Sequence, residues 1–394
     1  MTQGEAFNQW LGMNERLTRL WVYGALVNRG ISYRVRNLLG LLPHMRALTI
    51  TVTRRCNSRC IMCNIWRLRK DSDELALEEI TRFLSSPSLS DLVELDLTGG
   101  EPLLRPDLPQ LIEKVCALKH ENLRSLKTIA LATNGLLPGR ISEKVERILR
   151  TINGKFDLAM VCSLDGIGEC HDQIRGVPGA YSRALENIQR MGEIASRSRH
   201  FRLGIKTTIL PHNWEQIPAL MHFAAERGLF HVVSPVLFTA ERFRNLDRQP
   251  QLELLTPYYS YLIAFYSSEE LADYYYSHVV LDTLKHGTRR IQCSAGTDHF
   301  FVEGDGRIFP CPLVPIALGD IRATQPEGLL SSPKTLNASR MAGRLDQCKW
   351  CLEPGCIRFS QCTEGFAFLR FLLSHQGKRR FRKAYFGEGL FKYL

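Results

Sequence analysis

Nine of the twelve cysteines gather in two groups, and clustering of this kind is typical of metal ligands. The first group is Cys56, Cys60 and Cys63, with three and then two residues between neighbours. A [4Fe-4S] cluster normally takes four thiolates, so a loop with three leaves one iron open to a small ligand. Structural zinc is the competing interpretation, but zinc requires four ligands, and no nearby histidine or cysteine completes this loop.

The second group lies toward the C-terminus and contains Cys293, Cys311, Cys348, Cys351, Cys356 and Cys362. Twelve residues separate Cys293 from Gly306, and four more separate Gly306 from Cys311. In a reducing compartment, grouped cysteines are more often metal or redox groups than structural disulfides. A structural zinc ion at the pair Cys348 and Cys351 is the alternative.

A glycine motif, TGGEP at 98–102, stands between the two groups. Gly99 and Gly100 permit a close backbone approach that side chains would block, and Glu101 adds a carboxylate. Taken alone, the motif is also compatible with an ordinary turn.

Short β-rich runs alternate with helical patterns, which predicts an α/β fold with a parallel sheet covered by helices. In such folds, sites lie at the carboxyl ends of the strands, and the motifs above follow strands. Residues 304–306 predict a hairpin turn between HFFVE and RIFP. The six β-rich runs are 47–53, 92–98, 127–133, 156–163, 201–210 and 231–238.

The three-cysteine loop, placed after the first strand, resembles the signature loop of the radical S-adenosylmethionine (radical SAM) superfamily. TGGEP resembles the glycine-glutamate motif of the same family. The resemblance covers roughly residues 47–240 and implies a partial (β/α)6 TIM-like barrel. It also implies that the cysteines hold a [4Fe-4S] cluster, and that S-adenosylmethionine binds the open iron. Reductive cleavage would then give a 5′-deoxyadenosyl radical that abstracts hydrogen from a substrate.

The resemblance assigns further residues to the cofactor. Met62 would lie against adenine, the Gly99–Glu101 motif would receive the amino group, and Ser163 would bond the ribose. Arg175 would pair with the methionine carboxylate through its planar fork. The segment 163–166, which follows the fourth strand and includes Asp165, also has a counterpart in the family. The alternatives are core packing for Met62, a turn cap for Asp165 and a solvated surface charge for Arg175.

The second cysteine group resembles the auxiliary-cluster domains of the family. In the twitch version one [4Fe-4S] cluster would be held by Cys293, Cys311, Cys348 and Cys351. In the SPASM version Cys362 would join Cys293 and Cys311, and a second cluster would be held by Cys348, Cys351 and Cys356. No cysteine follows Cys362, and the spacings after Cys351 depart from the usual SPASM pattern. We therefore expect one auxiliary cluster, with two as the alternative.

The resemblance leaves the reaction outcome open. An auxiliary cluster that accepts an electron gives dehydrogenation, whereas a thiol that returns hydrogen gives epimerisation. The candidate hydrogen donors are Cys162, Cys356 and Cys362, although Cys162 also suits packing behind the fourth strand. We expect a small, sugar-like or cyclitol-like substrate, because no cobalamin motif is found and the segment before the barrel is short. A peptide-modifying maturase that forms a cross-link is the alternative. The expected electron donor is a flavodoxin or ferredoxin.

The net charge of +11 is compatible with a basic iron-sulfur or zinc protein that binds nucleic acid through residues 379–385. We do not favour that interpretation, because nucleic-acid binding does not explain the presence of the barrel motifs. The first ten residues show no secretory signal, and no apolar run of about 18 residues is present, so we expect a cytoplasmic protein.

Both ends of the chain carry amphipathic or basic aromatic patterns. Trp10, Met13, Leu17, Leu20 and Trp21 oppose Arg16 and Arg19 in the segment 6–42, and residues 377–386 are basic and aromatic. We expect helices packed on the barrel, with contact to a membrane surface or a partner as the alternative. The predicted divisions are a helical extension (1–46), the barrel (47–240), a helical connector (241–290), the auxiliary domain (291–365) and a tail (366–394).

Overall fold

The computed structural model describes residues 15–68, 73–253, 256–374 and 394. The chain divides into two compact units, each built from separate segments of the sequence. The barrel unit comprises His44–Leu254 and His299–Thr335, and the helical unit comprises Met1–Pro43, Leu255–Asp298 and Leu336–Leu394. The predicted auxiliary segment 291–365 therefore contributes to both units, and the predicted domain boundaries stay a prediction.

The barrel unit contains one sheet of nine strands among the described residues, in the order β6-β5-β4-β3-β2-β1-β7-β8-β9. Neighbouring strands from β1 to β6 are parallel, which confirms the predicted partial barrel of six strand-helix units. These strands are β1 (Ala47–Thr53), β2 (Glu94–Gly99), β3 (Thr128–Thr133), β4 (Asp157–Ser163), β5 (Phe201–Ile209) and β6 (Phe230–Pro235).

The remaining three strands extend this sheet beyond the six predicted units. β7 (His299–Val302) pairs in parallel with β1, and β8 (Arg307–Phe309) returns antiparallel to β7. The predicted hairpin at 304–306 is therefore present, and Gly306 has a φ of +89°, which glycine adopts without strain. β9 (Gly319–Asp320) completes the edge of the sheet.

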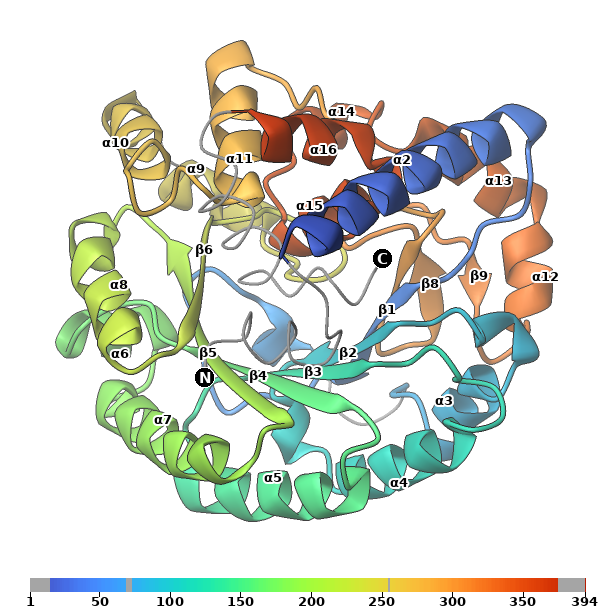
Figure 1. Cartoon of the computed structure of the whole chain (residues 1–394). Coiled ribbons are helices and arrows are strands. Elements are labelled where there is room, and N and C mark those ends of the chain that lie inside the picture. Colours follow the sequence, from blue (N-terminus) through green and yellow to red (C-terminus); the bar gives the residue numbers. More distant parts are fainter. Residues whose placement is uncertain (1–14, 69–72, 254–255, 375–393) are drawn as a thin grey trace. The chain divides into compact units, whose positions relative to one another are not determined.

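Helices cover one face of the sheet (Figure 1). Cys162 and Ile205 point to this face and pack with Ala184 and Leu220 of the covering helices. The apolar residues on this face of the strands and the apolar residues of the covering helices therefore form one layer of core. The α-helices of this unit are α3 (Leu77–Leu84), α4 (Leu108–Leu118), α5 (Pro138–Ile152), α6 (Glu169–Arg175), α7 (Ala180–Arg197), α8 (Ile217–Glu226), α9 (Gln249–Leu252) and α12 (Pro326–Ser331).

Single-turn 3-10 helices follow several of these strands. They are η1 (Ile65–Arg67), η2 (Pro87–Leu89), η3 (Pro102–Leu104), η4 (Trp214–Gln216) and η5 (Leu246–Arg248).

The helical unit is centred on α2 (Glu15–Leu39), which packs on α15 (Pro354–Glu364) and α16 (Phe366–Leu373). A Cβ atom added at Gly30 would lie 2.5 Å from the ring of Phe366, so glycine is what lets these helices approach. The other helices are α10 (Thr256–Tyr266), α11 (Tyr275–His286) and α14 (Asp346–Lys349), together with α13 (Pro333–Met341), which crosses the division between the units.

The apolar residues that the sequence analysis expected to pack lie on the outer face of α2. Leu17, Leu20 and Trp21 are exposed, whereas Val22 and Leu26 are buried. The expectation was wrong about the packing face. The face of α2 that contacts α15 and α16 is the one that carries Gly30 and the buried residues Val22 and Leu26. Trp10, Met13 and residues 377–386 lie outside the described residues. Among the described helices none is long and apolar enough to cross a membrane.

Candidate radical and auxiliary iron-sulfur sites

The loop that carries Cys56, Cys60 and Cys63 follows β1 and is fixed by backbone hydrogen bonds on both sides. Arg59 N donates to Arg175 O (2.9 Å), and Ile61 N donates to Ile174 O (3.0 Å), both at the end of α6. Asn64 N donates to Phe243 O (2.9 Å) in the segment after β6. The loop is therefore held by segments distant in sequence, and its conformation does not depend on local propensity alone.

Hydrogen-bond donors point at the sulfurs of this loop. Ser58 N lies 3.4 Å from Cys56 Sγ, and Ser58 Oγ lies 3.1 Å from Cys60 Sγ. Asn134 Nδ2 lies 3.8 Å from Cys56 Sγ, and Arg175 Nη1 lies 3.6 Å from Cys60 Sγ. Hydrogen bonds to sulfur are one way in which a protein sets the potential of an iron-sulfur cluster. The donor set therefore fits a thiolate-ligated cluster.

The thiols of the loop are costly to ionise without a bound cation. Burial raises the pKa of Cys56 and of Cys63 to about 12, and the neighbouring Cys60 adds to the rise. A metal bound by the sulfurs would reverse this cost, because ligation favours the thiolate. Across the described ranges, no three His, Cys, Asp or Glu side chains converge on a point that suits one metal ion.

Gly99 and Gly100 hold the end of β2 against the cysteine loop. Gly100 N donates to Thr53 O and Glu101 N donates to Arg55 O, both at 2.8 Å. A Cβ atom at Gly99 would lie 2.1 Å from Thr53 O, and one at Gly100 would lie 2.3 Å from Arg55 O. Only glycine permits this approach. The two motifs recognised in the sequence are therefore adjacent in the structure.

Glu101 is a buried carboxylate at the same strand end, with 2% of its surface exposed. It accepts hydrogen bonds from Asn134 N (2.7 Å), Thr133 Oγ1 (3.1 Å) and Leu103 N (3.2 Å). Burial raises the pKa of Glu101 to about 7, although these hydrogen bonds oppose the rise. A carboxylate has further lone pairs, so Glu101 can also accept a bond from a ligand amine.

Arg175 and Asp165 form a buried ion pair beside Cys60. Arg175 Nη2 lies 2.5 Å from Asp165 Oδ2, and Asp165 Oδ1 accepts from Thr208 N (2.8 Å). Arg175 is only 7% exposed, so the alternative of a solvated surface charge is wrong. Asp165 links β4 to β5, whereas the N-cap of α6 is Gly168, so Asp165 does not cap that helix. The role of Arg175 toward a methionine carboxylate stays a prediction.

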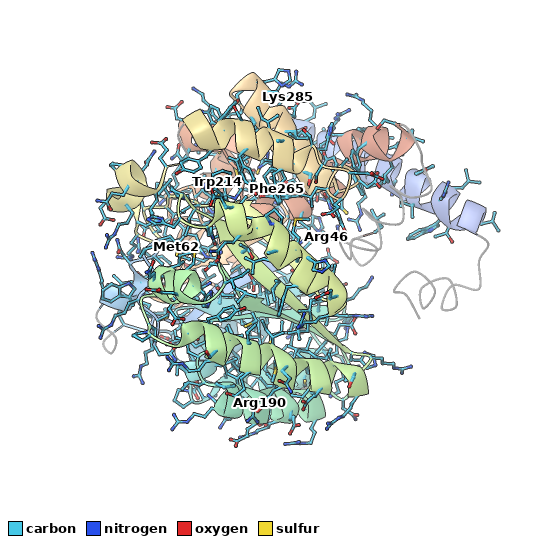
Figure 2. The ribbon with its side chains drawn as sticks, turned by 90° about the vertical axis from the view of Figure 1, so that its left-hand side faces the viewer. Arg46, Met62, Arg190, Trp214, Phe265 and Lys285 are labelled. Atoms are coloured by element: carbon cyan, nitrogen blue, oxygen red, sulfur yellow. The ribbon has the colours of Figure 1, made fainter. Side chains whose placement is uncertain are left out.

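Met62 and Ser163 lie on different parts of the site. Met62 is partly buried and packs on an apolar cluster that includes Ile174 and Val236. Figure 2 shows Met62 well away from Arg190, which lies on the outer helix α7. Ser163 ends β4 and pairs in register with Lys206 of β5. The adenine and ribose contacts assigned to Met62 and Ser163 stay predictions.

Cys162, a candidate hydrogen donor, lies on the helix-covered face of β4. Its sulfur accepts from Asn187 Nδ2 (3.5 Å), and burial raises the pKa of Cys162 to about 12. The neighbouring Ser163 points to the opposite face, because side chains alternate along a strand. This placement supports the packing interpretation of Cys162 rather than hydrogen donation.

Five auxiliary cysteines belong to the helical unit, and all five are buried: Cys293, Cys348, Cys351, Cys356 and Cys362. A side-chain hydrogen bond with Cys356 is the main cause that lowers the pKa of Cys351; burial opposes it, and Arg289 reinforces it. Cys356, to which the twitch interpretation gives no metal role, thus lies within hydrogen-bonding reach of Cys351, and the ligand set stays a prediction. Cys311 follows β8 in the barrel unit.

Several residues that contribute to these sites were not recognised in the sequence. Arg289 donates through Nη1 to Cys351 Sγ (3.5 Å). The sequence offers only a weak signal for the role of Arg289, because two adjacent arginines, Arg289 and Arg290, precede Cys293. Lys206 and Asp96 point to the sheet face opposite the helices, and the polar positions that alternate along their strands are the signal that was available.

Comparison with known proteins agrees with this geometry. Residues 50–224 match the family model of the radical SAM superfamily, and residues 293–356 match the SPASM model, an iron-sulfur cluster-binding domain. The chain belongs to the radical SAM superfamily and carries a SPASM domain. Together these domains imply [4Fe-4S] clusters and S-adenosylmethionine as cofactors.

Relatives and solved structures extend the match. An AdoMet-dependent heme synthase of Methanosarcina barkeri is 28% identical, over 70% of this chain and 79% of the relative. A probable GTP 3′,8-cyclase of Archaeoglobus fulgidus is 32% identical, over 52% of this chain and 72% of the relative. The structure of a histidine-tagged "anSMEcpe with bound AdoMet" has a TM-score of 0.54 at 16% identity, over 88% of this chain and 98% of that one. This structural likeness confirms the fold.

Proposed function

We propose that this chain is a radical SAM oxidoreductase that removes hydrogen from a small, hydroxylated molecule, of the sugar or cyclitol type, inside the barrel. The observation that carries the proposal is the chemistry of the inner face of the sheet, which is the face opposite the covering helices. Within strands β1 to β5, that face carries hydroxyl, charged and small side chains such as Thr49, Asp96 and Lys206.

The register of the strands identifies the residues of the inner face. Asp96 of β2 pairs with Thr49 of β1 and with Ala130 of β3, and Ala130 pairs with Ala159 of β4. Paired residues in a parallel sheet point to the same side, so all four belong to one face. The alanines occupy little volume in the middle of the face.

Polar contacts on the inner face support a hydroxylated substrate. Lys206 Nζ lies 2.6 Å from Ser234 Oγ, and Thr49 Oγ1 lies 3.3 Å from Asp96 Oδ2. Such groups suit a ligand with several hydroxyls, because each hydroxyl both donates and accepts hydrogen bonds.

A cationic side chain reaches the same face from the segment after β6. Arg242 Nη2 donates to Thr98 Oγ1 (3.2 Å), and its guanidinium carbon lies 5.7 Å from the ring centroid of Phe301. Arg242 therefore adds a fixed positive charge to one side of the inner face. This charge is compatible with a substrate that also carries a carboxylate or phosphate.

The residues of the radical site would act by binding and orientation. The three cysteines would hold the cluster, and Glu101 would receive the amino group of S-adenosylmethionine. Arg175, fixed by Asp165, would keep a positive charge beside Cys60. When bound, the cluster and S-adenosylmethionine supply a one-electron cleavage that abstracts hydrogen from the substrate. The expected electron donor is a flavodoxin or ferredoxin.

The placement of two of the three candidate thiols, Cys162 and Cys356, favours dehydrogenation over epimerisation. Cys162 faces the covering helices, and Cys356 is hydrogen-bonded to Cys351. Neither thiol is therefore placed to return hydrogen to a substrate. We propose one auxiliary [4Fe-4S] cluster as the electron acceptor, with Cys351 among its ligands and Cys356 added to the ligand candidates.

A peptide substrate is the second candidate, since the structure described as "Native anSMEcpe with bound AdoMet and Cp18Cys peptide" has a TM-score of 0.51. The names of the relatives favour a small molecule, because they refer to heme and GTP. Binding to nucleic acid is not favoured, because membership of the family accounts for the cysteines and the barrel.

The proposal is tested by assaying the anaerobically reconstituted protein with S-adenosylmethionine, a reductant and pools of sugars, cyclitols, porphyrins, nucleotides or peptides. We expect 5′-deoxyadenosine to rise with a hydroxylated small molecule and to fall in the Asp96→Asn and Lys206→Met variants. Arg190→Gln on the outer helix is the matched control and should behave like the parent. Stimulation by peptides alone would overturn the small-molecule proposal.

The outer face of α2 supports a separate proposal, contact with an anionic membrane surface. Exposed apolar residues recur along this face, and the chain carries a net charge of +11. We expect the protein to float with vesicles that contain phosphatidylserine but not with phosphatidylcholine alone, and Leu20→Asp with Ile31→Asp to abolish flotation. Absence of flotation with either vesicle would contradict the proposal.

A further inference from the structure

Arg289 is a buried cation beside three of the auxiliary cysteines, Cys293, Cys351 and Cys356. It follows α11 and precedes Cys293 by four residues, and 7% of its surface is exposed. Its backbone N donates to Lys349 O (2.6 Å), next to Cys348 on α14. Two segments that carry cysteines are thus joined at this residue.

The surroundings of the Arg289 guanidinium are thiols rather than carboxylates. Nη1 lies 3.5 Å from Cys351 Sγ, and Cys293 and Cys356 are also near enough to interact with its charge. Nε and Nη2 have no hydrogen-bond partner among the residues that the structure describes. A buried guanidinium normally pairs with a carboxylate, because an unpaired buried charge is costly.

The neighbouring arginine shows the ordinary arrangement. Arg290 Nε lies 3.1 Å from Asp282 Oδ2, and its side chain is largely exposed. Arg175 in the barrel unit is buried but pairs with Asp165. Within the described part of the chain, Arg289 pairs with no Asp or Glu side chain, so its environment calls for a different anion.

We propose that Arg289 is a fixed counter-cation for an iron-sulfur cluster bound by the cysteines of the helical unit, and that it raises the reduction potential of that cluster. The inference rests on the proposed auxiliary centre. A cluster ligated by thiolates carries negative charge, and one-electron reduction adds one more. The guanidinium stabilises the reduced state most, and so favours transfer of an electron from the substrate to the cluster.

Arg289 is in this view a positioning residue that acts through the cluster rather than on the substrate. Its two unpartnered groups, Nε and Nη2, point to further bonds with cluster sulfur or thiolate when the centre is assembled. A lysine at this position would keep the charge but lose the planar fork. Charge and hydrogen-bond geometry are therefore separable by substitution.

The test uses the full chain with Cys56, Cys60 and Cys63 changed to alanine, so that only auxiliary iron remains. Into this parent we introduce Arg289→Gln, Arg289→Lys and, as the matched control, Arg290→Gln. Iron content is measured first, and the midpoint potential is then followed by electron paramagnetic resonance during reductive titration.

We expect Arg289→Gln to bind iron like the parent but to shift the ratio of reduced to oxidised cluster at least tenfold toward the oxidised form at a fixed applied potential. For a one-electron couple this is a shift of about 59 mV to more negative potential. Arg289→Lys should lie close to the parent, and Arg290→Gln should be unchanged.

An unchanged potential in Arg289→Gln, with normal iron content, would overturn the inference. If Arg289→Gln binds no iron and Arg289→Lys restores it, the requirement for positive charge is supported. If neither variant binds iron, Arg289 is a packing residue and the inference is wrong. If the parent itself binds no iron, the auxiliary centre of the proposed function fails, and the inference fails with it.

Discussion

The buried carboxyl of Glu101 makes the stability of the cluster-free protein depend on pH in a way that one substitution isolates. Burial raises the pKa of Glu101 from 4.5 to about 7. The folded protein therefore binds more protons than the unfolded chain between these two values, and stability falls as pH rises through this window. A rise of about 2.5 units corresponds to about 3 kcal/mol of lost stability above pH 7.

Glu101→Gln removes this titration while keeping the shape of the side chain. The carboxamide of glutamine has one acceptor oxygen where the carboxylate has two, so it loses part of the hydrogen bonding from Thr133, Asn134 and Leu103, but that cost does not vary with pH. We therefore expect the difference in unfolding free energy between the parent and Glu101→Gln to change by about 3 kcal/mol between pH 4.5 and pH 8. Above pH 7 the change favours the variant.

The measurement is urea denaturation of the cluster-free protein at several pH values, with Glu74→Gln as the control. Glu74 accepts a hydrogen bond from Thr53 Oγ1 (3.0 Å) at the end of β1, but unlike Glu101 it is only half-buried. The control should keep the pH dependence of the parent. Parallel pH profiles for the parent and Glu101→Gln would refute the argument that burial of this carboxyl dominates.

Three further predictions concern the metal centres. Anaerobic reconstitution should give more iron than one cubane holds, and about four irons per chain would reject the auxiliary cluster. Changing Cys56, Cys60 and Cys63 to alanine should abolish 5′-deoxyadenosine formation while the helical unit keeps its iron; retained cleavage would contradict the assignment. Changing Ser163 to alanine should weaken binding of S-adenosylmethionine, measured by equilibrium dialysis, without loss of the first cluster; unchanged affinity would leave Ser163 a structural residue.

A test of the redox role of the auxiliary centre belongs with these. Cys351→Ala should still form 5′-deoxyadenosine when substrate is present but should fail to form oxidised product, as detected by mass spectrometry. Full oxidised product from a variant that lacks auxiliary iron would favour a redox-neutral reaction such as epimerisation.

Local patterns in the sequence were sufficient for the barrel and for the first cysteine loop. Hydrophobic periodicity and strand-helix alternation depend on neighbours a few residues apart, so both can be recognised without knowledge of the fold. The spacing of Cys56, Cys60 and Cys63 is likewise a property of one loop. The glycines of TGGEP also carried a physical signal, because the backbone approach at Gly99 excludes any side chain.

The sequence alone did not decide which side chains meet across long separations. The ion pair of Arg175 with Asp165 spans ten residues, and the contact of Arg289 with Cys351 spans 62. No local rule links such positions, since each contact depends on how distant segments pack. The same holds for the outer face of α2, whose apolar residues look like a packing face in the sequence.

The sequence by itself therefore determined the class of chemistry, the cysteine loop and the six-unit barrel, all of which are encoded at short range. Tertiary structure decided the direction of Cys162, the pairing of Cys351 with Cys356 and the burial of Arg289. Burial and charge pairing are properties of the packed chain, because they arise only when segments far apart in sequence exclude water from the same place.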